Sequence, residues 1–301
     1  MRIGIIGAGG VGAYYGGMLA QAGHEVRLLA RGESLAALRE RGLEVRTPED
    51  HFTVQVEAAS DPAALRGVEL AVVAVKGYSL DAVAPAARAA AEGGGAVLPL
   101  LNGVEASHRL AELGVPVGAV LGGATYISAA RVAPGVVERR SSFQRVLVGE
   151  LPAGTSPRVD AIVAAFRSAG VESEASPDIR LELWRKLTFL AAISAACGLV
   201  RGDIGSVRAR PLGSELVARL VGETAAVARA RGAALPPEEE ARVTAQIAGL
   251  PGPMKPSFLL DLLAGGPNEL EILSGAVSRL GAATGLPTPV HDVAVTVLST
   301  P

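Results

Sequence analysis

The sequence predicts an α/β protein in which a domain built on a parallel β-sheet is followed by an all-helical domain. Three observations lead to this prediction. Strand-like runs alternate with helical segments in the first half of the chain, a glycine-rich turn follows the first run, and no convincing strand follows Pro177. Such alternation implies right-handed crossovers and therefore a parallel sheet. We expect domains at residues 1–177 and 178–301.

The first half of the chain is predicted to hold six strands with helices between them. Glu69–Val75 is almost continuously apolar, as a strand buried on both faces should be. The expected strands are Arg2–Ile6, Glu25–Leu29, Val54–Ala58, Glu69–Val75, Ala96–Leu101 and Val117–Leu121. The expected helices are Val11–Ala22, which Gly23 ends, Leu80–Ala91 and Val104–Leu113.

The pattern changes after the sixth strand. Val136–Glu138 and Arg145–Gly149 suggest a short antiparallel pair, Pro157–Ala169 a helix, and Val171–Ser173 a strand that closes the first domain. Beyond it the chain is rich in Ala, Leu and Arg at helical spacing. The helices expected there span residues 178–200, 213–231, 237–249, 257–264 and 268–284.

The composition narrows the class of protein. Of the 301 residues, 49% are hydrophobic, which is enough for a buried core. Lys and Arg number 28 against 30 Asp and Glu, so no basic excess favours a nucleic-acid or anionic-membrane surface. One cysteine, Cys197, excludes an intrachain disulfide, and four dispersed histidines indicate no metal site. The apolar stretch Leu187–Val200 is shorter than the ~20 residues of a spanning helix, so we expect a soluble cytoplasmic protein.

The glycine-rich turn has the pattern G-x-G-x-x-G between a predicted strand and a predicted helix. It consists of Gly7, Ala8, Gly9, Gly10, Val11 and Gly12. In this context Gly7 permits the tight turn, Gly9 lets a pyrophosphate approach the backbone, and Gly12 lets the helix pack on the strand. The helix N-terminus then offers free N–H groups to the anion. We interpret the turn as a dinucleotide site and the domain as Rossmann-type; the alternative is a turn without a ligand.

The end of the second strand indicates which dinucleotide binds. Sites that prefer NAD carry Asp or Glu there, to accept from the ribose 2′-hydroxyl. This chain has no acid at that point and has Arg31 instead, which suits the 2′-phosphate of NADP. The alternative is a solvated surface arginine.

Four further residues could carry chemistry. Lys76 and Asn102 each follow a buried strand, where open α/β sheets bind ligands, although a solvated Lys and a turn-forming Asn-Gly are the alternatives. Lys186 opens an apolar helix face shared with residues 190, 194 and 197, so desolvation could make it a proton donor. The alternative is a Lys that reaches solvent from the helix edge. Glu269 begins another helix, where it could simply compensate the helix dipole.

Taken in order along the chain, these segments resemble the ketopantoate reductase (2-dehydropantoate 2-reductase) family. The matching pieces are GAGGVG, GHEV, AVKGYS, LNG, LWRKL and SFLLDLLAGGPNELEILSGAV, and they span nearly the whole chain. The resemblance implies a Rossmann domain plus a helical domain with the active site in the cleft between them. It also implies NADPH-dependent reduction of a 2-oxo acid to a 2-hydroxy acid, namely 2-dehydropantoate to (R)-pantoate on the route to pantothenate and coenzyme A.

The resemblance also implies residue roles. Lys186 matches the catalytic Lys of the family and Glu269 its catalytic Glu, while Ser257 matches a substrate-contacting Ser. Lys76 and Asn102 match the Lys and Asn of the cofactor domain, and Asn102 also faces the substrate.

Two departures from the family concern the substrate. The family has Asn four and eight positions after the catalytic Lys, and this chain has Leu190 and Ser194. An unpaired buried hydroxyl costs roughly 1–3 kcal/mol, so Leu190 favours a less polar 2-oxo acid. Alternatives are therefore a related reductase for such an acid, another NADP-linked dehydrogenase of similar architecture, and a non-catalytic NADP-binding protein. We expect a small-molecule partner and allow for a homodimer.

Overall fold

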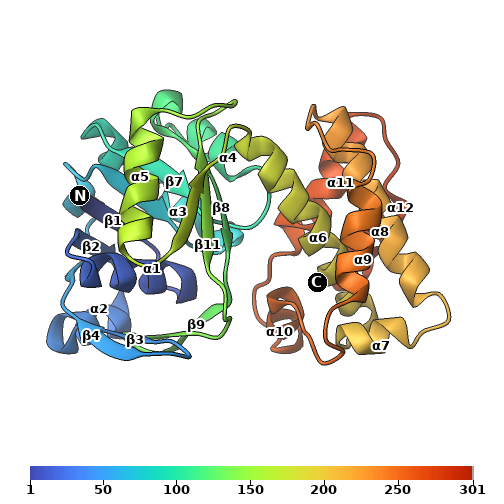
Figure 1. Ribbon diagram of the computed structural model, residues 1–301, viewed down its shortest axis with the longest axis horizontal. Coiled ribbons are helices and arrows are strands. Elements are labelled where there is room, and N and C mark those ends of the chain that lie inside the picture. The colour runs from blue at the N-terminus through green and yellow to red at the C-terminus, as the bar shows by residue number, and fades with distance from the viewer. Residues whose placement is uncertain (300–301) are drawn as a thin grey trace. The chain divides into compact units, whose positions relative to one another are not determined.

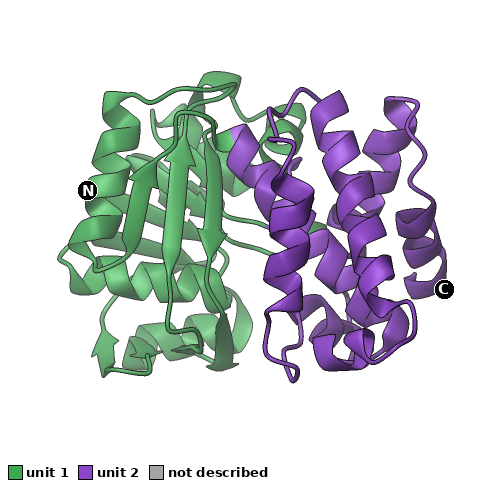
Figure 2. Cartoon of the chain, turned by 45° about the vertical axis from the view of Figure 1, so that its right-hand side comes forward, with its two compact units in different colours: residues 1–101, 106–179 green, residues 102–105, 180–301 purple. Residues whose placement is uncertain are grey.

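The computed structural model describes residues 1–299, which fall into two compact units. The first unit contains Met1–Leu101 and Ala106–Ile179, and the second contains Asn102–Glu105 together with the chain from Arg180 onward (Figure 2). The α/β class is confirmed, with a parallel sheet in the first unit and helices in the second.

A five-stranded parallel sheet forms the centre of the first unit (Figure 1). Its order is β5 (Glu57–Ala59), β2 (Glu25–Leu29), β1 (Arg2–Ile6), β6 (Leu70–Val73) and β7 (Ala96–Pro99). The helices of this unit are α1 (Gly10–Gln21), α2 (Gly32–Arg41), α3 (Leu80–Glu92), α4 (Ala106–Glu112) and α5 (Pro157–Ser168). Short 3₁₀ turns lie at Pro62–Leu65, Gly77–Ser79 and Val117–Ala119.

The sheet is covered on both faces, which explains the apolar strands. In β1 the side chains alternate, so Ile3 and Ile5 join one core cluster and Ile6 joins the other. The first cluster includes Tyr15 of α1 and Phe166 of α5, whose rings meet edge to face at 5.5 Å. The predicted strands at the start of the chain and at residues 25–29, 69–75 and 96–101 are confirmed, with ends that shift by up to two residues.

Two smaller sheets complete the first unit. One has the order β4 (His51–Val54), β3 (Leu43–Arg46), β10 (Val136–Arg139) and β9 (Ala129–Ala133). The other has the order β12 (Glu172–Ala175), β11 (Arg145–Gly149) and β8 (Gly122–Tyr126).

The prediction that Val136–Glu138 pairs with Arg145–Gly149 is wrong. β10 pairs antiparallel with β9 and parallel with β3, whereas β11 pairs with β8 and β12 in the other small sheet. The missing partner is β9, whose sequence AARVA is half-exposed and has little β-branched character.

Two predicted strands are also wrong. Val117–Leu121 forms a 3₁₀ turn and an isolated bridge, and the strand β8 starts only at Gly122. Gly122 is required there, because a Cβ at this position would overlap the side chain of Ile179. Val54–Ala58 is divided between β4 and β5, which belong to different sheets although one alternating pattern runs through both. Helix α2 and strand β3 lie in a segment for which the sequence had predicted no element.

The second unit contains only helices among its described residues. They are α6 (Ile179–Val200), α7 (Ile204–Arg208), α8 (Gly213–Ala230), α9 (Glu239–Ala248), α10 (Ser257–Leu263), the 3₁₀ turn η4 (Leu270–Ile272), α11 (Ser274–Ala283) and α12 (Pro289–Leu298). The predicted helix over residues 268–284 is wrong in its first half, because Leu273 leaves the helical region at φ −105° and ψ −99°. Helices α7 and α12 were not predicted.

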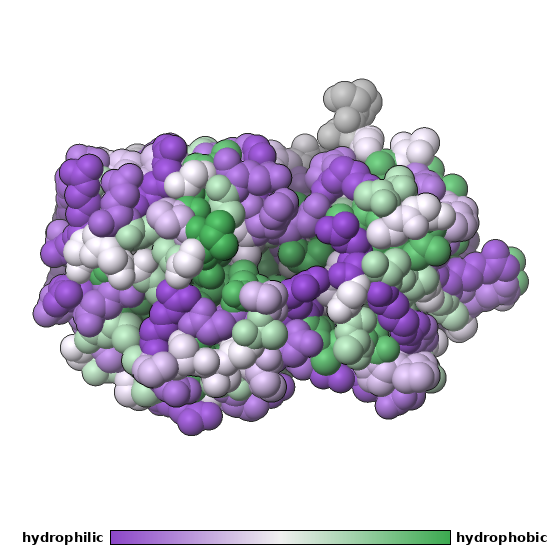
Figure 3. Space-filling model, turned by 90° about the horizontal axis from the view of Figure 1, so that it is seen from above, coloured by the Kyte–Doolittle hydropathy of each residue, from purple (hydrophilic) through white to green (hydrophobic). Residues whose placement is uncertain are grey.

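Helix α6 is the centre of the second core. Its length and hydropathy would suit a membrane span, but 67% of its most apolar window is buried within the protein. Trp184, Leu187 and Ile193 belong to the core cluster that it shares with α8 and α10. On the face that Figure 3 shows, hydrophilic residues repeatedly interrupt the hydrophobic ones.

Candidate functional site

The glycine-rich turn joins β1 to α1, and at three of its glycines the neighbouring backbone leaves no room for a side chain. Gly7 has a φ of +114°, and a Cβ there would lie 2.9 Å from the carbonyl oxygen of Ala74. A Cβ at Gly12 would overlap the carbonyl oxygen of Gly7, and one at Gly10 would overlap that of Ala129. These glycines therefore hold the strand, the turn and the helix in close contact.

Gly9 differs from its neighbours, since a Cβ there would meet no atom within 4 Å. Gly9 is also the N-cap of α1, and no side chain caps that helix end. The first-turn N–H groups consequently lack a side-chain acceptor and face a space that the missing Cβ leaves open. This turn fits the pyrophosphate of a dinucleotide.

Two predicted cofactor residues follow strands that flank β1. Because the carboxyl ends of parallel strands share one edge of the sheet, Arg31 after β2 and Lys76 after β6 lie at the edge where the glycine-rich turn lies. Lys76 is half-buried, and the preceding residue, Val75, packs against Gly7.

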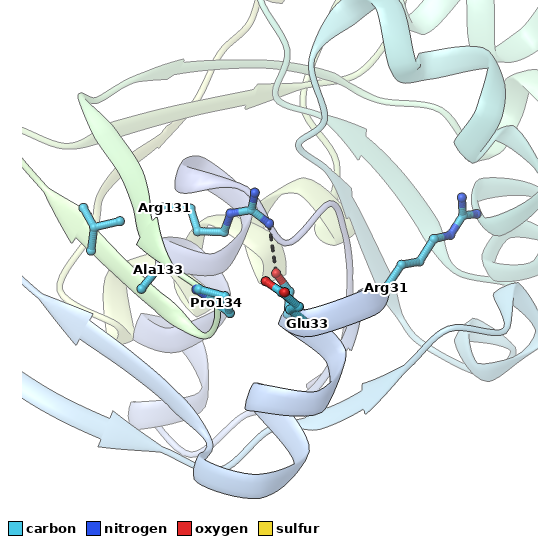
Figure 4. Close-up of a pocket in the computed structure, with 7 residues that line it drawn as sticks. Arg31, Glu33, Arg131, Ala133 and Pro134 are labelled. Carbon is cyan, nitrogen blue, oxygen red and sulfur yellow. Dashed lines mark hydrogen bonds between the residues drawn. The ribbon is translucent and has the colours of Figure 1, made fainter.

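A cavity of about 410 Å³ opens beside the start of α2 (Figure 4). Arg31, Glu33 and Ser34 line one side, and residues 131–134 of β9 and the following turn line the other. Arg131 reaches across and donates a hydrogen bond to the Ser34 hydroxyl, with an Nη1–Oγ distance of 2.9 Å. Arg31 extends away from Arg131 in this view.

The second unit brings together three predicted residues: Lys186 on α6, Glu269 at the N-cap of η4, and Asn102. Lys186 is 8% exposed and Glu269 is 4% exposed, so both charges are buried. The Asn102 side-chain amide donates to Glu269, with an Nδ2–Oε2 distance of 3.1 Å. A cation and an anion with a neutral amide donor therefore form one buried polar cluster.

Burial lowers the pKa of Lys186 from 10.5 to about 8, because desolvation disfavours the ammonium form. The carboxylate of Glu269 acts in the opposite direction and raises that pKa. Lys186 is therefore an acid that can lose its proton near neutral pH.

The segment Asn102–Glu105 is fastened to the second unit at three points. Asn102 bonds Glu269, and Gly103, with a φ of +89°, lies so close that a Cβ would be 3.0 Å from the carbonyl oxygen of Ile272. Arg279 of α11 donates to Glu105 at 2.8 Å. These contacts determine where Asn102 is placed.

The remaining predicted residues differ in their surroundings. Leu190 is half-buried on α6, one turn beyond Lys186, and Ser257 is exposed at the start of α10. Ser194 is 3% exposed on α6, two turns beyond Lys186. Cys197 is buried, and desolvation raises its pKa to about 12, so its thiol is unreactive.

Sequence reasoning did not find Arg131 and Ser34. They are 97 positions apart, and only the fold places the two residues in contact. One signal was available in part: Pro134-Gly135 marks the hairpin turn after β9, and recognising it would have assigned Arg131 to a strand.

Comparison with known proteins gives two family matches. Residues 3–153 match the family described as "Ketopantoate reductase PanE/ApbA", and residues 178–300 match "Ketopantoate reductase PanE/ApbA C terminal". Among curated proteins, a 2-dehydropantoate 2-reductase of Halobacterium salinarum is 34% identical over 304 residues, covering 100% of this chain and 96% of the relative.

Solved structures of the same family are also similar to this chain. A PanE/ApbA family ketopantoate reductase from Ralstonia eutropha aligns with a TM-score of 0.90 at 32% identity, covering 99% of this chain and 97% of its own. A 2-dehydropantoate 2-reductase from Geobacter metallireducens aligns with a TM-score of 0.90 at 27% identity, covering 99% of both chains.

Proposed function

The chain belongs to the ketopantoate reductase family, whose members are NADPH-dependent oxidoreductases, and from this premise we propose that it reduces 2-dehydropantoate to (R)-pantoate. The observation that carries the proposal is the buried ammonium of Lys186 beside Glu269. A buried lysine with a pKa near 8 suits a general acid, because it holds a proton at neutral pH and releases it readily.

NADPH, when bound, supplies the hydride that reduces the ketone carbon of the substrate. Lys186 donates a proton from Nζ to the ketone oxygen, which becomes the hydroxyl of the product, and Lys186 then regains a proton from solvent. Before that transfer its positive charge stabilises the negative charge that develops on the oxygen.

Glu269 and Asn102 support this acid. The Glu269 carboxylate raises the pKa of Lys186 and so keeps more of it protonated at neutral pH. The bond from Asn102 holds one Glu269 oxygen and thereby orients the carboxylate. We assign the catalytic role to Lys186 and Glu269, and the positioning of the cluster to Asn102.

The same proposal divides the work between the domains at residues 1–177 and 178–301. Gly7–Gly12 binds the pyrophosphate, with Arg31 and Lys76 at the same sheet edge. Leu190, Ser194 and Ser257 contact the substrate, and the buried Ser194 hydroxyl donates to a substrate oxygen. We further propose that the protein acts in the cytoplasm, a reducing compartment in keeping with its free Cys197.

A less polar 2-oxo acid is the second candidate substrate, because Leu190 offers no hydrogen bond one turn beyond Lys186. The test compares NADPH oxidation with 2-dehydropantoate and with 3,3-dimethyl-2-oxobutanoate, which differs only by lacking the terminal hydroxyl. A site that bonds this hydroxyl should prefer 2-dehydropantoate by about 100-fold or more in kcat/KM. Equal or reversed preference would favour the second candidate. Tight NADPH binding without turnover of either acid would overturn the proposal of an enzyme.

A further inference from the structure

The pocket at the start of α2 is lined by two arginines from distant parts of the chain. Arg31 precedes α2 and Arg131 lies on β9, and both line the same cavity of about 410 Å³. No described carboxylate forms an ion pair with either side chain. We propose that Arg131 is a specificity-determining residue for NADPH, which binds the adenosine 2′-phosphate together with Arg31 and Ser34.

The Arg131 side chain is already held in place. Its Nη1 donates to the hydroxyl of Ser34 at 2.9 Å, and Ser34 is itself buried at 6% exposure. Arg31 is exposed and extends away from Arg131 (Figure 4), so it must change rotamer to reach a shared anion. Such changes take picoseconds to nanoseconds in exposed side chains. Arg131 is therefore the pre-organised half of the pair.

The position of the pocket favours the 2′-phosphate over the pyrophosphate. The pocket begins where β2 ends, which is where dinucleotide folds recognise the adenosine ribose. None of the residues 7–12 lines it. Strand β9 nevertheless starts beside the turn, since a Cβ at Gly10 would overlap Ala129, and Arg131 lies two residues further along. The strand thus leads from the pyrophosphate site to the ribose site.

Glu33 reduces the positive charge of the pocket. Its carboxylate lines the same pocket and would repel a phosphate, which leaves a net positive charge of one from the two arginines. Glu33→Gln should therefore strengthen the binding of a 2′-phosphate, while Arg131→Met should weaken it.

The experiment measures binding without turnover, and it rests on the proposed function only in assuming that NADPH is the cofactor. Calorimetry compares adenosine 2′,5′-bisphosphate with adenosine 5′-monophosphate, and dinucleotide fluorescence compares NADPH with NADH. The variants are Arg131→Met, Arg131→Lys, Arg31→Met and Glu33→Gln. The control is Arg140→Met, whose arginine pairs with Glu138 outside the pocket.

We expect Arg131→Met to weaken NADPH and the bisphosphate by about tenfold or more while leaving NADH and the monophosphate within about twofold. Arg131→Lys should recover part of the loss, and Arg140→Met should behave as wild type. Equal weakening of both members of each pair would overturn the inference, because it would indicate a pyrophosphate contact or a merely structural bond to Ser34. Unchanged NADPH binding in a folded variant would overturn it too. If the wild-type protein binds no NADPH at all, the proposed function fails instead.

Discussion

Replacing Lys186 with Met tests the buried acid through both activity and stability. The variant removes the proton donor, so kcat should fall by about 10²- to 10⁴-fold. The folded protein holds this amine at a pKa of about 8 instead of 10.5, which means that burial of the ammonium costs about 3 kcal/mol at pH 7. Removing the charge should therefore raise the free energy of unfolding by most of this amount. The single variant, however, leaves the Glu269 carboxylate buried without the Lys186 cation, which lowers stability. The double variant Lys186→Met/Glu269→Gln removes that complication.

The sign of the pH dependence follows from proton linkage. Between pH 8 and 10.5 the unfolded chain binds more protons at Lys186 than the folded one, so wild-type stability rises with pH in that window. From pH 7 to 9.5 the difference between wild type and double variant should shrink by about 2 kcal/mol. Urea unfolding followed by fluorescence reports on this region, because Trp184 is the only tryptophan and lies on α6 at 4% exposure. An identical stability difference at both pH values would refute the buried-ammonium reasoning.

Three further outcomes are expected. Glu269→Gln removes the carboxylate that raises the pKa of Lys186, so the alkaline limb of the pH–rate profile for oxo-acid reduction should move to lower pH. An unmoved limb would contradict the electrostatic coupling between Glu269 and Lys186. Gly103→Ala should cost about 1–3 kcal/mol of strain and also reduce kcat/KM, whereas Gly232→Ala, with a φ of +83° in open space, should cost stability alone; denaturant curves and steady-state kinetics separate the two. Gly9→Ala should cost about 1 kcal/mol of stability, because Gly9 is the N-cap of α1, yet bind NADPH at least about tenfold more weakly by fluorescence titration. Undiminished affinity would place the pyrophosphate elsewhere.

The sequence was most informative where one local pattern decides the structure. Strand β1, the turn after it and helix α1 follow from glycine geometry and apolar alternation, and the structure confirms them. Helix α6 was predicted to within one residue, because an apolar run between charged residues leaves few other folds. The prediction of β8 failed because its two glycines weaken a strand pattern, although Gly122 allows close packing against Ile179 and Gly123 against Leu98 and Pro99.

In the candidate site, too, local patterns identified residues, whereas tertiary contacts between distant residues could not be predicted. Lys186 and Glu269 were named from their places on predicted helices, and the resemblance supplied their catalytic roles. Their common burial and the bond from Asn102 depend on tertiary contacts between residues as much as 167 positions apart. Strand pairing in the small sheets could not be deduced, because an alternating pattern gives the buried face of a strand and not the identity of its neighbour.

The excursion of Asn102–Glu105 has a consequence for protein engineering. Residues Asn102–Glu105 belong to the helical unit, although the chain on both sides of them belongs to the first unit, and the rest of the helical unit begins at Arg180. The two units therefore cannot be separated by dividing the chain at one position. A chimera that joins the N-terminal part of one relative to the C-terminal part of another would take Asn102–Glu105 from one parent and their partners Glu269 and Arg279 from the other. Exchange of Glu105 and Arg279 as a matched pair would then be needed to keep Asn102 against Glu269.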